Sequence, residues 1–182
     1  MEIEARVKVD NLENLRAKLK TLGAECSAAE AQNDIIYKEK SKACETQKAG
    51  SYILRIRETG TKSFLTFKAL TERKGVWKEY EVEIDDAQRM QQILHTLGFV
   101  NVLEMHKTRQ HARLDKINIC LDKIKELGTY LECEIIGEHP EQAKQELKTL
   151  LQKLGYDKKE IIHDGYLALL FKSKGIRFEG TA

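Results

Sequence analysis

The sequence predicts an α+β fold in which an eight-stranded antiparallel barrel, or tunnel, carries helices on its outside and consists of two repeated halves. Eight segments alternate apolar and polar residues, as half-buried strands do. The connections between them are short, and turns such as 58–62 and 126–128 favour antiparallel hairpins over crossovers. A strand and helix unit also recurs 75 positions along the chain.

The alternating segments give the strands in order. We predict strands at 2–9, 32–40, 51–58, 63–70, 76–85, 100–113, 116–125 and 129–136. Leucines at helical spacing after Asp10 predict a capped helix that ends at Gly23. Pro140 opens another helix with one apolar face, and the segment 161–171 predicts a last one.

The repeat relates the first strand and helix to the fifth strand and the helix after it. Eight residues of the first unit match eight of the second: Val7, Val9, Asp10, Leu15, Leu19, Thr21, Leu22 and Gly23 correspond to Val82, Ile84, Asp85, Met90, Leu94, Thr96, Leu97 and Gly98. Junctions between strands and capped helices also converge on such patterns without a common origin. Of the two explanations we favour a duplication.

Length and charge limit the classes of function. The chain has 182 residues and a formal net charge of +2, from 31 Lys plus Arg against 29 Asp plus Glu. It is long enough to bury one core, so we expect one domain over 1–182. The balanced charge argues against nucleic acid as a partner. The longest charge-free stretch, 90–103, contains polar residues, so we expect a soluble cytoplasmic protein without a membrane partner.

The cysteines suggest neither a disulfide framework nor a zinc site. The four are Cys26, Cys44, Cys120 and Cys133, and no two of them form a C-x-x-C pair.

Charged residues gather on one face of each strand, with the two signs separated by strand. In the first strand Glu2, Glu4, Arg6 and Lys8 alternate with apolar residues, so all four point the same way. The bases of the later strands are Arg55, Arg57, Lys68, Lys107, Arg109, His111 and Arg113, and the acids of the last two strands are Asp122, Glu132 and Glu134.

A closed barrel would turn these charged faces inward and form a polar tunnel. Such a tunnel suits a polyanion and a divalent metal, because Mg²⁺ binds carboxylates together with phosphate oxygens and arginine offers them paired donors. The alternative is an open sheet with a solvated charged face, whose ion pairs contribute about 0.2–1 kcal/mol each. We interpret Glu79, Glu81 and Glu83 as such a solvated row beside Lys78.

Several short motifs, taken in order, resemble the CYTH family of triphosphate tunnel enzymes, which includes class IV adenylyl cyclases and thiamine triphosphatases. The resemblance runs from Glu2 to about Leu170. The family opens with E-x-E-x-K, and here Glu2-Ile3-Glu4-Ala5-Arg6 has arginine in place of the lysine. The other matching elements are Leu54-Arg55-Ile56-Arg57, Lys68, Lys107-x-Arg109, Leu121-Asp122, Glu132-x-Glu134 and a tail, Gly165-Tyr166-Leu167-Ala168-Leu169-Leu170, similar to the S-Y-x-x-L-L ending of class IV cyclase-like members.

The resemblance implies a metal-dependent reaction on a triphosphate, with Mg²⁺ or Mn²⁺ as the cofactor. The metal ligands that it implies are Glu2, Glu4, Asp122, Glu132 and Glu134. The groups that hold phosphates would be Arg55, Arg57, Lys68, Lys107, Arg109 and Arg113. Arg6 and Lys8 take the catalytic position, where Lys8 partly substitutes for the signature lysine, since arginine does not readily release a proton.

Three hypotheses remain for the function. A class IV adenylyl cyclase-like enzyme, which we favour, directs the ribose 3′ hydroxyl of ATP onto the α-phosphorus and releases pyrophosphate. A triphosphatase admits water at the terminal phosphorus of tripolyphosphate, thiamine triphosphate or a nucleotide. A polyphosphate-binding protein without catalysis is the third, and there Arg6 marks a lost activity. Resemblance to class IV cyclases also implies a homodimer.

The sequence does not single out a nucleoside pocket. The aromatic candidates for stacking on a base are Tyr37, Tyr52, Phe64 and Trp77, and each also suits ordinary packing. His106, His111 and His163 receive no catalytic role, because a histidine beside arginines is usually a surface or network residue.

Overall fold

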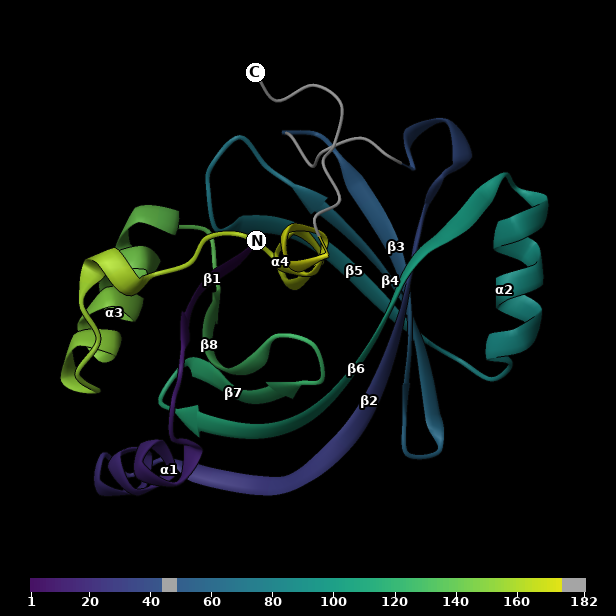
Figure 1. The fold of residues 1–182 in the computed structure, drawn as a ribbon. Helices are drawn as coiled ribbons and strands as arrows, with labels where there is room; N and C mark the ends of the chain where they lie inside the picture. Colours follow the sequence, from purple (N-terminus) through teal and green to yellow (C-terminus); the bar gives the residue numbers. More distant parts are fainter. Residues whose placement is uncertain (44–48, 175–182) are drawn as a thin grey trace.

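The protein forms a closed antiparallel barrel, seen in a computed structural model that describes residues 1–43 and 49–174 (Figure 1). Around the barrel the strands follow the order β1-β5-β4-β3-β2-β6-β7-β8. The strands are β1 (Glu2–Lys8), β2 (Glu25–Glu39), β3 (Tyr52–Thr59), β4 (Lys62–Leu70), β5 (Val76–Ile84), β6 (Phe99–Leu114), β7 (Ile117–Ile124) and β8 (Gly128–Ile136). The fold class predicted from the alternating segments is confirmed.

Four helices accompany the strands in the described residues. They are α1 (Leu12–Thr21), α2 (Ala87–Thr96), α3 (Pro140–Lys153) and α4 (Tyr166–Ser173), with short 3₁₀ turns at Lys40–Lys42 and Lys158–Glu160. Pro140 is the first residue of α3, as predicted, because the first turn of a helix needs no hydrogen bond from that backbone nitrogen. None of the helices in the described residues is long and apolar enough to cross a membrane.

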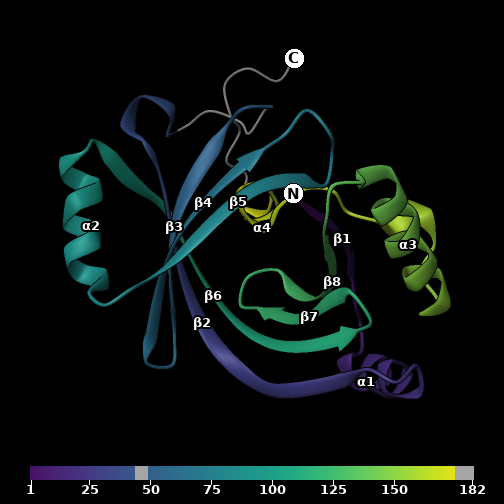
Figure 2. The ribbon, with the colours of Figure 1, turned by 180° about the vertical axis from the view of Figure 1, so that it is seen from behind.

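The two halves of the chain have the same order of elements, a strand, a helix and three strands. Their first strands are exchanged, since β1 pairs along its length with β8 of the second half, while β5 pairs with β4 of the first. The barrel therefore closes only when both halves are present (Figure 2).

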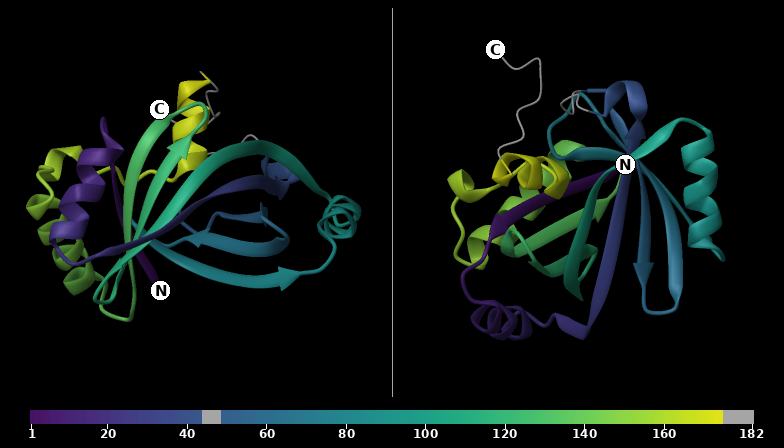
Figure 3. Two further views of the ribbon diagram at one scale, coloured as in Figure 1. Left: turned by 90° about the horizontal axis from the view of Figure 1, so that it is seen from below. Right: turned by 45° about the vertical axis from the view of Figure 1, so that its right-hand side comes forward.

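Helices cover the outside of the barrel on two opposite sides (Figure 3). On one side α1 and α3 pack on the outer faces of β1, β7 and β8 through a leucine-rich core that includes Leu19, Leu147 and Leu151. On the other side α2 packs on β2 and β3 around Tyr37 and Ile56. With the apolar faces covered in this way, the second face of each strand is turned inward.

The fourth helix packs inside the barrel and not on its surface. Its apolar side chains Leu167, Leu170 and Phe171 contact inward-facing residues of β2, β3 and β6, among them Ile53 and Leu103. This helix therefore fills one end of the interior, where the inward faces are apolar.

The barrel closes weakly between β1 and β5, which share only the pairs Glu2 with Trp77 and Ile3 with Val76. Beyond them, the Glu4 nitrogen donates to the Gly75 carbonyl at 2.9 Å, and the Ile162 nitrogen donates to the Arg6 carbonyl at 2.8 Å. The segment before α4 therefore takes the place of a strand partner on this side of β1.

Three local predictions need correction. The cap of α1 is Asn11 and not Asp10, because the Asn11 side-chain oxygen accepts a hydrogen bond from the Asn14 backbone nitrogen at 3.0 Å. The last helix begins at Tyr166, since residues before it run extended along β1. Strand β2 begins earlier than predicted, at Glu25, because it pairs with the long strand β6 from that point.

Among the four cysteines, Cys44 lies outside the described residues. The other three are free thiols in the part of the chain that the structure describes.

Candidate active site in the barrel interior

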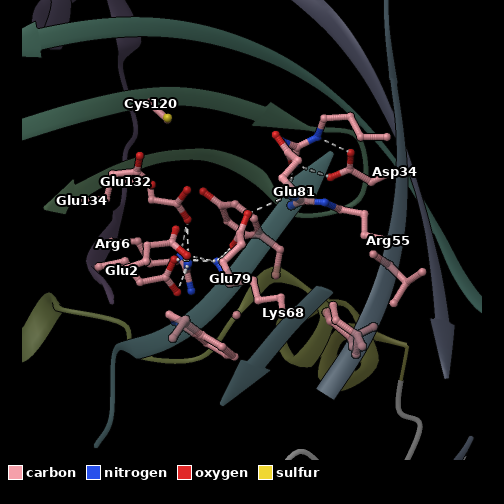
Figure 4. A pocket seen from close by; sticks show the side chains of 18 of the residues that line it. Glu2, Arg6, Asp34, Arg55, Lys68, Glu79, Glu81, Cys120, Glu132 and Glu134 are labelled. Atoms are coloured by element: carbon pink, nitrogen blue, oxygen red, sulfur yellow. Dashed lines mark hydrogen bonds and ion pairs between the residues drawn. The ribbon is translucent and has the colours of Figure 1, made fainter. Parts of the chain in front are cut away.

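The inward faces of the strands enclose a cavity of about 680 Å³. All eight strands and the start of α4 contribute side chains to its lining. This volume lies in the range of small-molecule sites. Figure 4 shows the charged lining in two groups, with Arg6 and Glu132 on one side and Arg55 and Asp34 on the other.

The first group is rich in bases and centres on Asp34. Arg57 donates to both of its carboxylate oxygens, at 2.7 and 2.9 Å, and Lys107 Nζ donates to Oδ2 at 3.2 Å. Burial opposes ionisation of Asp34, yet Lys107, Arg57 and Arg55 hold its pKa well below the ordinary range. Burial, helped by the charges of Arg109 and Arg57, lowers the pKa of Lys107 to about 8. Positive charge is thus in excess here.

The second group is a row of three carboxylates linked by two arginines. Arg6 Nη2 lies 2.6 Å from both Glu4 Oε1 and Glu132 Oε2. Arg109 donates to both oxygens of Asp122, at 2.7 and 2.6 Å, and its Nη2 lies 3.0 Å from Glu132 Oε1. Burial opposes the ionisation of Glu132, but the two arginines lower its pKa strongly. In this row the carboxylates outnumber the cations.

Lys68 joins this row to strand β5. Its Nζ lies 2.8 Å from Glu2 Oε2, 3.5 Å from Glu4 Oε2 and 3.0 Å from Glu79 Oε2. Burial raises the pKa of Glu2 to about 9 in spite of Lys68, with a further contribution from the charges of Glu4 and Glu79. One ammonium therefore does not neutralise the three acids around it.

Arg55 lies next to this cluster on strand β3. Its Nη2 contacts Thr66 Oγ1 at 3.0 Å, Glu81 Oε2 at 3.2 Å and Glu79 Oε1 at 3.3 Å. These hydrogen bonds to β4 and β5 orient the guanidinium, and part of it remains accessible from the cavity.

The structure brings most of the predicted site residues together. The predicted residues that line the cavity are Glu2, Glu4, Arg6, Arg55, Arg57, Lys68, Lys107, Arg109, Glu132 and Glu134. Asp122 lies fully buried behind Arg109, where Tyr166 also bonds to it.

Two predicted residues lie away from the cavity. Lys8 is exposed at the end of β1, and Arg113 is exposed near the end of β6, where it donates to the Asp115 carbonyl. Both point to the same side as the alternate charged residues of their strands, but the strands continue past the end of the tunnel. Alternation predicts the face of a strand and not where the cavity ends.

Sequence reasoning gave no site role to several lining residues, among them Asp34, Glu79, Glu81 and Tyr166. The interpretation of Glu79 and Glu81 as solvated is wrong, because both line the cavity, while Glu83 pairs at the surface with Lys62. Asp34 lies between isoleucines and asparagine, so no alternation marked it. Tyr166 comes from a helix whose docking is not visible in any local pattern. For Asp34, Glu79 and Glu81 the signal is pairing between distant strands, and for Tyr166 it is the docking of α4 into the barrel.

Of the aromatic candidates for a nucleoside pocket, Trp77 lines the cavity, with Lys68 Nζ 5.1 Å from its ring centroid. Tyr37 packs in the core under α2.

The carboxylates fit a hard divalent cation that is shared with phosphate. Within the described parts of the chain, no three His, Cys, Asp or Glu side chains converge on one point that would hold a metal. Mg²⁺ at phosphate sites, however, takes one or two carboxylates and completes its shell with water and phosphate oxygens. Glu4 and Glu132 satisfy that requirement, because both contact a single nitrogen of Arg6.

Two known proteins are similar to this chain along most of its length. A provisionally named adenylate cyclase of Methanocaldococcus jannaschii is 31% identical over 93% of this chain and 98% of its own. A solved structure from Pyrococcus horikoshii OT3 is 25% identical, with a TM-score of 0.82 over 93% of this chain and 99% of its own.

A provisionally named adenylyl cyclase from Hippeastrum, described as having a dominant triphosphatase activity, is 17% identical with a TM-score of 0.64, over 98% of this chain and 97% of its own. That likeness is one of fold. A sequence model of the CYTH domain matches residues 1–166, which include every strand, the acids and bases of the tunnel and the start of α4. The chain therefore belongs to the CYTH family.

Proposed function

We propose that this chain is a metal-dependent, class IV adenylyl cyclase-like enzyme that converts ATP to cyclic AMP and pyrophosphate inside the barrel. The observation that carries the proposal is the buried excess of positive charge around Lys107, next to a row with an excess of carboxylates. A bound polyanion would neutralise the first group, and a divalent cation would neutralise the second. A triphosphate with its metal supplies both.

The name of the M. jannaschii relative supports the cyclase, because that relative is similar over nearly the whole of both chains. The base-rich group would hold the phosphates. Its donors are Arg55 and Arg57 of β3 and Lys107 of β6, the two strands that flank β2. Fixed guanidinium forks hold phosphate oxygens in line with little loss of conformational freedom.

The carboxylate row would hold the metal, with Glu4 and Glu132, which line the cavity, as the nearest donors and Asp122 behind Arg109 as a further one. A divalent cation bound there would stabilise the charge that builds on the phosphate oxygens as pyrophosphate leaves. Arg6 takes part as a fixed positive charge, because its guanidinium donates to Glu4, Glu132 and the Asp164 carbonyl. We expect it to accept no proton from the attacking hydroxyl.

A triphosphatase is the second candidate. The Hippeastrum protein shows that a barrel of this fold supports that activity. The fixed Arg6 argues against a hydrolase that uses a lysine at the signature position. A triphosphatase with Arg6 would have to rely on water activated by the metal.

The test is an analysis of end products with ATP, tripolyphosphate and thiamine triphosphate, each in Mg²⁺ and in Mn²⁺. Cyclic AMP with matching pyrophosphate supports the cyclase and places attack at the α-phosphorus. Orthophosphate without cyclic AMP makes the protein a triphosphatase. Binding without any product leaves the non-catalytic polyphosphate-binding protein. The expected homodimer and cytoplasmic location stay predictions, the first of which light scattering tests.

A further inference from the structure

A short segment before and at the start of α4, 162–166, contacts the carboxylate row from the end of the barrel. Ile162 donates to the Arg6 carbonyl, and the Asp164 carbonyl accepts from Arg6 Nη1. Asp164 is also paired with Lys172 on α4, which ties the segment to its helix. The segment is therefore bound to strand β1 at the residue that replaces the family's signature lysine.

Tyr166 is the residue of this segment that reaches the row itself. Its hydroxyl donates to Asp122 Oδ2 at 2.9 Å, the oxygen that also accepts Arg109 Nη2 at 2.6 Å. Burial and the charges of Glu132 and Asp122 raise the pKa of this hydroxyl, so it remains a donor. Asp122 is fully buried, and Tyr166 and Arg109 together fix its carboxylate.

The ring of Tyr166 lies close to two cations of the tunnel. The guanidinium carbon of Arg6 lies 4.7 Å from the ring centroid, and Lys107 Nζ lies 5.9 Å from it. A cation over an aromatic face gains more when both are desolvated, and Tyr166 and Arg6 are both buried. The Tyr166 side chain thus contacts Asp122 and Arg6 of the carboxylate row and Lys107 of the base-rich group.

These contacts explain an arginine at position 6. Its planar group lies over the Tyr166 ring and also donates to Glu4, Glu132 and the Asp164 carbonyl. A lysine ammonium is a point with three donors and no planar face, so it would not make the same set of contacts.

We propose that Tyr166 is a positioning residue of the tunnel, which sets the Asp122 carboxylate through its hydroxyl and the Arg6 guanidinium through its ring. The inference rests on the proposed function as far as it concerns turnover. It further implies that α4 is part of the active site and that Arg6 and Tyr166 act as a pair.

The experiment compares Tyr166→Phe with Tyr130→Phe. Tyr130 is a matched control, because it is buried and packs edge-on against Tyr166 at 5.5 Å between centroids, and within the described residues it is Tyr166 whose hydroxyl donates to Asp122. Tyr166→Phe keeps the ring on Arg6 and removes only the hydroxyl. We expect kcat to fall by roughly tenfold and KM for the triphosphate to stay within about twofold of the wild-type value. Losses of this size are typical when a residue that hydrogen-bonds to a metal ligand is changed. Tyr130→Phe should match the wild type.

Two readouts do not depend on turnover. Mn²⁺ affinity in the presence of tripolyphosphate, followed by the electron paramagnetic resonance of free Mn²⁺, should weaken by roughly tenfold in Tyr166→Phe and not in Tyr130→Phe. Hydrogen exchange of the amides in 162–170 should speed up in Arg6→Lys and stay slow in Tyr130→Phe.

The outcomes separate the positioning role from the proposed function. A wild type without product overturns the enzyme, while the Mn²⁺ and exchange measurements still decide the role of Tyr166. If the wild type also binds no Mn²⁺, hydrogen exchange decides it. Equal kcat and equal Mn²⁺ affinity in Tyr166→Phe and wild type would overturn the proposal. So would equal losses in both tyrosine variants, or unchanged exchange in Arg6→Lys.

Discussion

Arg57 and Asp34 form a fork-to-fork ion pair between β3 and β2 that recurs in the second half of the barrel with its charges exchanged. At the repeat distance of 75 positions, Asp34 corresponds to Arg109, which pairs in the same bidentate way with Asp122 of β7. In both halves the two residues lie directly opposite in the strand register. The repeated fold thus keeps the ion pair but exchanges which strand carries the acid: it comes from β2 in the first half and from β7 in the second.

The pair predicts how Asp34→Asn behaves. The change leaves Arg57 and Lys107 buried without a full negative partner, so we expect unfolding to become easier by about 3 kcal/mol. Saturating tripolyphosphate should restore more stability in this variant than in the wild type, because the ligand replaces the missing charge. Urea unfolding with and without tripolyphosphate measures both effects.

Glu83→Gln is the matched control for that variant. It also changes an acid to an amide, but in an exposed pair with Lys62, where we expect a cost below about 1 kcal/mol. An Asp34→Asn protein that gains no more from tripolyphosphate than the wild type would show that the base-rich group is not the anion site.

Lys107 predicts a pH dependence of phosphate binding. Its pKa is lowered to about 8, so it loses its charge as the pH rises through that value. A bound phosphate favours the charged form, so the affinity for tripolyphosphate without metal should fall between pH 7 and pH 9.5. Fluorescence of Trp77, the only tryptophan, reports binding because its ring lines the cavity.

The variant Lys107→Met should bind more weakly at pH 7 and lose most of this slope. Because the pKa of Glu2 is raised to about 9, the same titration in Glu2→Gln separates the two groups. A slope that persists unchanged in Lys107→Met would assign the effect to another residue.

The two arginines near the end of β6 distinguish the tunnel from the rest of the strand. Arg109 is buried between Asp122 and Glu132, whereas Arg113 is exposed and bonds to a backbone carbonyl. We expect Arg109→Gln to lose metal-dependent turnover by at least about a hundredfold, and Arg113→Gln to keep it. Equal loss in both would place the substrate farther along β6 than the cavity indicates.

Glu132 is the carboxylate on which the row depends. The sequence predicts that Glu132→Ala loses metal-dependent activity and stays folded, but the structure adds a cost, because Arg6 and Arg109 would both lose a buried partner. We expect activity to be lost and unfolding to become easier by about 3–5 kcal/mol. Activity assays and urea unfolding of the same preparation check both, and an unchanged rate would remove Glu132 from the set of metal ligands.

Much of this arrangement follows from local sequence. Alternation places Glu2, Glu4 and Arg6 on one face, and the structure turns that face into the cavity, because a strand with one apolar side has a single way to pack. Alternation does not identify the inward face of β5, because Tyr80 and Val82 on the opposite face are 60% and 57% exposed and so do not mark a buried side. Which side of β5 faces inward depends on barrel closure between distant strands.

The contacts of Tyr166 show the same limit for the site. Nothing within the tail of the sequence indicates that this side chain bonds to Asp122, since the two are brought together by the docking of α4 into the barrel. Likewise, the end of the tunnel, which excludes Lys8 and Arg113, is set by the relative stagger of the strands and not by any one of them.

Gly75 predicts that the closure between β1 and β5 controls the carboxylate row. Its φ is +72°, and a Cβ there would lie 2.8 Å from the Glu4 carbonyl oxygen. Gly75→Ala should therefore strain the backbone and also push Glu4 away, whereas Gly98→Ala, at φ +87° with nothing within 4 Å, meets only the backbone strain. We expect a loss of about 1 kcal/mol in Gly98→Ala and more in Gly75→Ala, with weaker Mn²⁺ binding only in the latter. Urea unfolding and Mn²⁺ titration measure the two effects, and equal Mn²⁺ affinity in both variants would show that Glu4 tolerates the shift.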